Sequence, residues 1–128
     1  MRAMIVPLLA LLVAELAEAR PPPLCRAHPE RVGACRTVHG RLFVANGTPS
    51  TRIWVVGTRR ILGVREYYGP DGGEVVAVPA GVRRALGSNP FLTQVYGDFE
   101  ICPLSRQRRG WMQSVCVASA RRLHARRR

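Results

Sequence analysis

The chain has 128 residues with 20 basic and 8 acidic side chains, a formal net charge of +12, and no lysine among its basic residues. This length holds one domain. A hydrophobic content of 47% excludes a disordered chain. No apolar run reaches the roughly 20 residues that a bilayer-spanning helix needs.

Residues 1–19 have the pattern of a secretory signal peptide. Arg2 supplies the positive start, residues 4–14 form an apolar stretch, and Ala17-Glu18-Ala19 is a small-x-small cleavage site. The alternative is a buried N-terminal helix, which the prolines inside and just after the run disfavour. We therefore expect a secreted or periplasmic protein that is not an integral membrane protein after processing.

Four cysteines follow this segment: Cys25, Cys35, Cys102 and Cys116. An even number of cysteines in an exported chain predicts two disulfides, with three possible connectivities. Residues 99–104 and 111–117 look like two strands of a hairpin, which places Cys102 opposite Cys116 at a distance that a disulfide can span. This geometry favours a Cys102–Cys116 bridge, which leaves Cys25 to pair with Cys35.

A zinc site is the alternative use of the first two cysteines. Cys25, His28, Cys35 and His39 give four nitrogen or sulfur ligands within fifteen residues. The spacing fits known zinc motifs loosely, and export favours oxidation over metal binding. We therefore expect neither a metal nor a cofactor.

The elements expected after the signal peptide are separated by glycine and proline turns. Residues 20–34 are a Pro-rich loop and residues 35–120 form a β-domain. Within that domain we expect strands at 38–45, 51–56, 60–66 and 75–78, a short helix at 79–86, an ambiguous segment at 91–96 and a hairpin at 98–119. Residues 121–128, which contain five arginines, are expected to be a disordered basic tail.

This succession predicts a mainly β protein, namely a small antiparallel β-sandwich or open barrel with one short helix and two disulfides. The expected core residues are Trp54, Val56, Phe99, Ile101 and Trp111.

The arginine excess suggests an anionic partner. The candidate anion-binding residues are those of two clusters: Arg106, Arg108 and Arg109 in the hairpin turn, and Arg121, Arg122, Arg126, Arg127 and Arg128 in the tail. Anionic lipid or acidic polysaccharide of an envelope is accessible to an exported chain, whereas the few aromatic residues give no evident platform for stacking nucleic acid bases. We expect no nucleic acid partner. The alternative is that the arginines reflect composition only and lie on solvated faces.

Catalytic motifs are absent from the sequence. Asp98 and Glu100 lie two apart on an expected strand and hence on one face, a spacing that suits acid–base chemistry but equally suits a solvent face that answers nearby arginines. Asn46-Gly47-Thr48 fits a glycosylation acceptor, but Asn-Gly is also a strong turn signal. A small hydrolase or metal-binding protein is the least favoured interpretation.

The stretch of residues 40–64 (GRLFVANGTPSTRIWVVGTRRILGV) resembles the first hairpin of transthyretin-like and carboxypeptidase-regulatory-like domains. That resemblance implies a small secreted β-sandwich with an accessory or binding role, and it transfers no functional residue. The whole chain also resembles small secreted bacterial proteins. We therefore expect an exported, non-enzymatic binding or structural accessory module of the bacterial envelope, or else a cationic binder of anionic lipid or polysaccharide.

Overall fold

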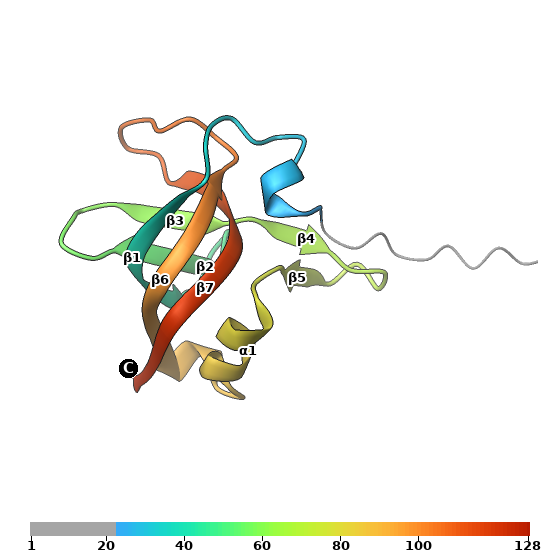
Figure 1. Ribbon diagram of the computed structural model, residues 1–128. Coiled ribbons are helices and arrows are strands. Elements are labelled where there is room, and N and C mark those ends of the chain that lie inside the picture. The colour runs from blue at the N-terminus through green and yellow to red at the C-terminus, as the bar shows by residue number, and fades with distance from the viewer. Residues whose placement is uncertain (1–22) are drawn as a thin grey trace, which may run out of the picture.

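The computed structural model describes residues 23–128, except for the side chain of residue 74, so the predicted signal peptide lies outside the described residues. Five strands close into a barrel (Figure 1). They are β1 (Arg36–Val44), β2 (Thr51–Val55), β3 (Ile61–Val64), β6 (Thr93–Pro103) and β7 (Gln113–Arg127). The order around the barrel is β1-β2-β3-β7-β6, and β6 pairs back with β1. Neighbours are antiparallel except β3 and β7, which run parallel.

Shorter elements precede or connect the barrel strands. The 3₁₀ turn η1 (Cys25–Ala27) comes before β1. Between β3 and β6 lie a small sheet of β4 (Glu66–Tyr68) and β5 (Glu74–Val76), the helix α1 (Ala80–Leu86) and a second 3₁₀ turn, η2 (Pro90–Leu92). The strand order and the helix between the third and fourth barrel strands match the five-stranded Greek-key barrel called the OB-fold. The mainly β class with a short helix and two disulfides is thus confirmed, with a barrel as its architecture. Among residues 23–128, no helix is long and apolar enough to cross a bilayer.

The core follows the alternation of each strand. Leu42, Ile53 and Leu62 point inward from β1, β2 and β3, and each has no exposed surface. Phe99 and Ile101 of β6 are equally buried and join the same cluster, as expected. The helix α1 contributes one fully buried residue, Val82, to this cluster, and it covers the end of the barrel where the C-terminus lies (Figure 1).

Two opposed glycines let the barrel close tightly between β1 and β6. Gly40 pairs with Gly97 in the register of the two strands. A Cβ at Gly40 would lie 2.5 Å from Ile53 Cγ2, and a Cβ at Gly97 would lie 2.6 Å from Leu123 Cδ2. Neither separation is possible for real atoms, so core side chains occupy the space that two larger residues would need.

Two expectations about the core are wrong. Trp111 is 69% exposed, because β7 begins only at Gln113 and Trp111 lies in the loop before it. Trp54 and Val56 are half-buried rather than central, since Trp54 points outward from β2 and Val56 lies just beyond its end.

The basic tail is also not disordered, contrary to expectation. Residues 121–127 continue β7 and pair with β6, with Ala125 opposite Val95 and Arg127 opposite Thr93. The physical reason is Leu123, which packs against the core from this segment while the surrounding arginines point to solvent.

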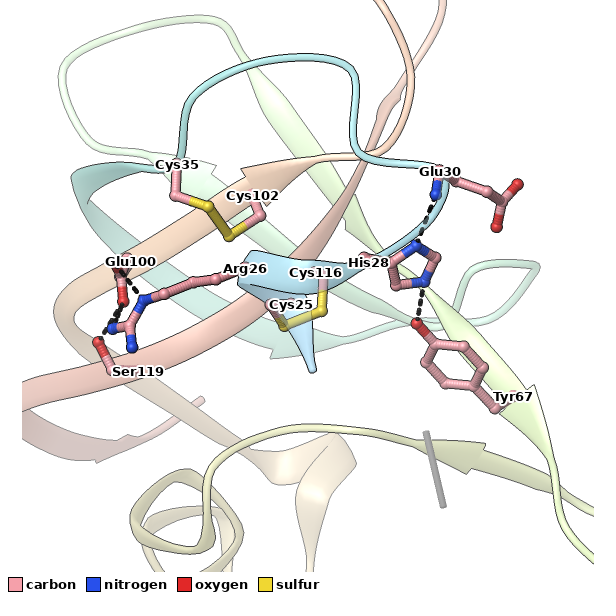
Figure 2. The surroundings of a disulfide bond; sticks show 10 residues. All are labelled: Cys25, Arg26, His28, Glu30, Cys35, Tyr67, Glu100, Cys102, Cys116 and Ser119. Atoms are coloured by element: carbon pink, nitrogen blue, oxygen red, sulfur yellow. Dashed lines mark hydrogen bonds and ion pairs between the residues drawn. A yellow bond between two sulfur atoms is a disulfide. The ribbon is translucent and has the colours of Figure 1, made fainter. Parts of the chain in front are cut away.

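The disulfide connectivity differs from the expected one. The bridges are Cys25–Cys116 and Cys35–Cys102, with Cα–Cα distances of 5.5 and 4.1 Å (Figure 2). The hairpin register does place Cys102 opposite Cys116, as predicted. However, the N-terminal segment lies across the hairpin, where Val32 N–H donates to the Pro103 carbonyl at 3.0 Å. Each cysteine of the hairpin therefore meets a partner from this segment.

These bridges overturn the zinc alternative. Cys25 and Cys35 are both oxidised and cannot act as thiolate ligands. Across residues 23–128, no three His, Cys, Asp or Glu side chains gather as a metal site would require. His28 is instead buried in a hydrogen-bonded position beside Tyr67, and His39 contacts Asp98.

Candidate functional site

The two predicted arginine clusters lie at opposite ends of one hairpin. Arg106, Arg108 and Arg109 belong to the β6–β7 loop, whereas the tail arginines lie on the far half of β7 or, for Arg128, just beyond its end. Since β6 has 11 residues and a strand rises about 3.3 Å per residue, the clusters are separated by up to about 35 Å. They do not form one site.

The tail arginines divide into two kinds. Arg122 makes an ion pair with Asp98 at 2.7 Å, and Arg121 lies opposite Asp98 in the register. Arg126 and Arg128 instead stack on aromatic rings: Arg126 Cζ lies 5.8 Å from the centre of the Tyr96 ring. Arg127 is exposed beyond this face.

The stacked arginines of the tail lie next to Arg41 of β1, which is also stacked on aromatic rings and which the sequence analysis did not select. Alternation on β1 places Arg41 and Phe43 on the same outward face, and the register places Trp54 of β2 directly opposite Arg41. The guanidinium carbon of Arg41 lies 5.0 Å from the Trp54 ring centre and 5.4 Å from that of Phe43. These are cation–π distances, so the two rings hold the guanidinium between them.

Neighbouring strands extend this arrangement across the barrel wall. Tyr96 of β6 lies opposite Arg41 on the other side of β1. Arg128 stacks on Phe43 at 5.4 Å and donates a hydrogen bond to the Val44 carbonyl at 3.0 Å. We call this surface the basic aromatic face; it comprises Arg41, Phe43, Arg52, Trp54, Tyr96, Arg126 and Arg128.

Carboxylates do not neutralise this face. The ion pairs within residues 23–128 use Arg26, His39, Arg65 and Arg122, and none involves an arginine of the basic aromatic face. Arg41 Nε is buried and has no hydrogen-bond partner. The buried Nε is closed to a ligand, so an incoming acceptor would meet the remaining N–H groups of the guanidinium.

The acidic residues of the same outer surface are occupied by other cations. Hydrogen bonds from His39 and then from Arg122 hold the pKa of the Asp98 carboxyl below its usual value. A hydrogen bond from Arg26 does the same for the pKa of Glu100, with help from Ser119 (Figure 2). Both groups share a face, as predicted, but both are held ionised, whereas a general acid at neutral pH needs a raised pKa.

The loop arginines contribute to a different surface. Arg108 and Arg109 line a cavity of about 350 Å³ together with Arg59, Arg60 and Trp111. Arg108 Cζ lies 5.1 Å from the Trp111 ring centre. Arg106 is exposed and lies outside this cavity.

The sequence contains a pattern from which the position of Arg41 could have been predicted. The alternation of residues 38–45 already places Arg41 and Phe43 on one face. The remaining step was the register of the hairpin around the turn at residues 46–50, which brings Trp54 opposite Arg41. The aromatic content of the whole chain is low, but Phe43, Trp54 and Tyr96 share the basic aromatic face.

Comparison of the chain with protein-family models, with curated protein sequences and with solved structures finds no match. The resemblance of residues 40–64 to transthyretin-like domains therefore stays a prediction, and the function has to be argued from the geometry.

Proposed function

We propose that the protein is an exported, non-enzymatic binding module that binds an acidic polysaccharide of the bacterial envelope through the basic aromatic face. The observation that carries this proposal is Arg41, which is stacked between Phe43 and Trp54, makes no ion pair and has a buried Nε without a partner. Such a guanidinium is already positioned, so an anionic group binds it at a small cost in side-chain entropy.

The chemistry of arginine supports a carboxylate ligand. The planar guanidinium donates two parallel hydrogen bonds to a carboxylate, and charge-assisted bonds of this kind are roughly twice as strong as neutral ones. Arg41 and Arg126 come from β1 and β7, and Arg128 lies just beyond the end of β7. A polymer with a carboxylate on each repeating unit can contact such a spread of cations, whereas a small anion contacts one.

The aromatic rings argue for a polysaccharide over nucleic acid. Single-stranded nucleic acid binds by stacking its bases on free aromatic faces. Here Phe43 is only 7% exposed, and Arg41 and Arg128 cover its ring. The two disulfides also favour an oxidising compartment, where anionic envelope polymers are accessible.

The test compares polygalacturonate with its fully methyl-esterified form, which has the same backbone without the charges. We expect binding to polygalacturonate only, with an affinity that falls as salt rises. Arg41→Gln should weaken binding about 10- to 100-fold, the effect of losing a hydrogen bond between charged groups. The matched control is Arg84→Gln, which removes an exposed arginine of α1 and should leave the affinity unchanged.

Three results would overturn the proposal. They are equal binding of the ester, equal weakening by Arg84→Gln and Arg41→Gln, and tighter binding of a single-stranded oligonucleotide than of polygalacturonate at the same salt concentration. The last result would assign the basic aromatic face to nucleic acid.

A further inference from the structure

The two loops at one end of the barrel are braced against each other. Because β3 and β7 are parallel, they start together, with Leu62 opposite Gln113. The β2–β3 turn and the β6–β7 loop therefore lie at the same barrel end (Figure 1). Arg60 donates to Gln113 Oε1 at 2.8 Å, and Gln113 Nε2 donates to the Ser105 carbonyl at 3.0 Å. Gln113 is only 8% exposed, so this bridge is fixed in place.

Large apolar side chains project from this end of the barrel. Trp111 is 69% exposed, Ile61 40% and Met112 38%, and all three line the same cavity. Isolated exposed apolar residues are common on proteins, whereas three that line one cavity are typical of a surface that binds a partner. We call the surface formed by Arg59, Arg60, Ile61, Arg108, Arg109, Trp111 and Met112 the loop tip.

Four arginines surround the apolar residues of the loop tip. No Asp or Glu lines the cavity, and none of the four takes part in an ion pair within residues 23–128. Arg108 stacks on Trp111, which keeps a positive charge beside the exposed indole ring of the loop tip. The loop tip is therefore apolar at its centre and positive at its rim.

We propose that the loop tip docks the protein on the surface of an anionic phospholipid bilayer. Trp111, Met112 and Ile61 enter the headgroup region, where the amphipathic indole ring of tryptophan is favoured. The arginines bind lipid phosphates and are attracted by the negative surface potential. A second copy of this chain does not fit the loop tip, because four arginines on each copy repel one another.

This surface is distinct from the one used in the proposed function. The basic aromatic face lies on the barrel wall formed by β2, β1, β6 and β7, whereas the loop tip lies at the end of the barrel. On the wall, Arg41 and Arg128 cover Phe43, which is only 7% exposed, whereas Trp111 at the tip stays 69% exposed beside Arg108. The wall therefore suits a polyanion and the tip suits a bilayer, and both can be occupied at once.

The experiment measures partitioning of the purified, disulfide-bonded chain onto vesicles of phosphatidylcholine with or without 30% phosphatidylglycerol. We expect binding to the anionic vesicles and little binding to the neutral ones. Arg108→Gln with Arg109→Gln should lower partitioning about 25-fold, since each basic residue near an anionic surface contributes roughly fivefold. The matched control, Arg84→Gln with Arg127→Gln, removes two exposed arginines away from the loop tip and should lower it much less.

Fluorescence tests the insertion separately. In the Trp54→Phe variant the remaining tryptophan emission comes from Trp111. We expect a blue shift and quenching by brominated lipids on binding. Trp111→Ser should weaken partitioning severalfold without unfolding the chain, because this side chain is 69% exposed.

The inference fails if neutral vesicles bind equally, if the two double variants weaken binding equally, or if Trp111 remains unquenched. Displacement of the protein by inorganic phosphate at constant ionic strength would show a phosphate site rather than a bilayer surface and would also overturn it. Polygalacturonate binding should be unchanged in the Arg108→Gln, Arg109→Gln variant, so this inference and the proposed function fail separately.

Discussion

The arginines of this chain do different work according to what each one touches. Arg122 and Arg26 contact carboxylates of β6. Arg122 links β7 to β6, and Arg26 links the N-terminal segment to β6. Arg41 and Arg128 contact rings and keep their charge unneutralised. Because exposed ion pairs contribute little to stability, the first kind adds modestly to the fold, while the second kind leaves charge for a ligand.

Asp98 should make the stability of the protein depend on acid pH. The pKa of Asp98 is lowered in the folded state by His39 and then by Arg122. Its contribution to the free energy of unfolding is therefore fully present above the unfolded pKa of about 3.9. The contribution is lost as the pH falls through the lower, folded value. We expect the stability difference between the wild type and Asp98→Asn to be present at about pH 5 and to shrink below about pH 4. Denaturant unfolding of both proteins between pH 2 and 7 measures it, and a difference that does not vary with pH would contradict the assignment.

Tyr67 should make the stability depend on alkaline pH in the opposite sense. His28 Nδ1 accepts the Glu30 N–H at 3.1 Å, so Nε2 carries the proton and donates to Tyr67 Oη at 2.9 Å (Figure 2). Burial raises the pKa of Tyr67 in the folded state, an effect opposed by Arg65. The contribution of Tyr67 to the free energy of unfolding is therefore fully present below the unfolded pKa of about 10. It is lost as the pH rises through the pKa of Tyr67 in the folded protein.

The Tyr67→Phe variant tests this dependence. At neutral pH we expect it to lose about 1 kcal/mol, the net value of one hydrogen bond. Above about pH 10 the wild type should lose stability as the half-buried phenol ionises, so that the difference between the two proteins narrows. Ultraviolet titration of tyrosinate should show that one of the three tyrosines titrates late in the wild type and that this late titration is missing in the variant. Three tyrosines with the same titration midpoint would count against the argument.

At the scale of strands and turns, the sequence allowed most of the meander to be predicted. Alternation marked β1, and the turn at residues 46–50 marked the hairpin with β2. The last part of β7 was missed because a single leucine among many arginines is a weak periodic signal, although Leu123 packs against the core. The parallel pairing of β3 with β7 was also out of reach, because it joins segments about fifty residues apart and no local pattern encodes it.

Two glycine substitutions should change the stability in opposite directions. At Gly40, facing Gly97 where the barrel closes, an added Cβ would lie 2.5 Å from Ile53 Cγ2, and overpacking of this kind costs about 1–3 kcal/mol. At Gly81 in α1, an added Cβ would lie 3.4 Å from Leu123 Cδ1, an ordinary contact. We expect Gly40→Ala to destabilise the protein and Gly81→Ala to stabilise it by about 0.5–1 kcal/mol, because alanine favours the helix. Thermal or denaturant unfolding measures both, and equal effects would contradict the packing described for Gly40.

For the whole molecule, the N-terminal segment is the part that local reasoning placed wrongly. The hairpin register itself was predicted correctly, yet the opposition of Cys102 and Cys116 in that register favoured the wrong sulfur partners. The actual bridges join residues 91 and 67 positions apart, and closing such long loops restricts the unfolded chain more than a ten-residue loop does. Two further contacts come from the same segment: Arg26 pairs with Glu100 of β6, and His28 hydrogen-bonds Tyr67 of β4 (Figure 2). The segment therefore links the barrel to the β4–β5 sheet.

Tryptic mapping without reduction should distinguish the two connectivities, because an arginine separates each cysteine from the next. The pairing in the structure links the peptide that ends at Arg26 to residues 110–121, and residues 32–36 to residues 85–106. The local pairing would instead link the peptide that ends at Arg26 to residues 32–36, and residues 85–106 to residues 110–121. Mass spectrometry separates these products by mass. Both connectivities leave no free thiol among the four cysteines, so only the masses of the cross-linked peptides decide between them. A linked pair of residues 85–106 with residues 110–121 would disprove the arrangement of the N-terminal segment across the hairpin.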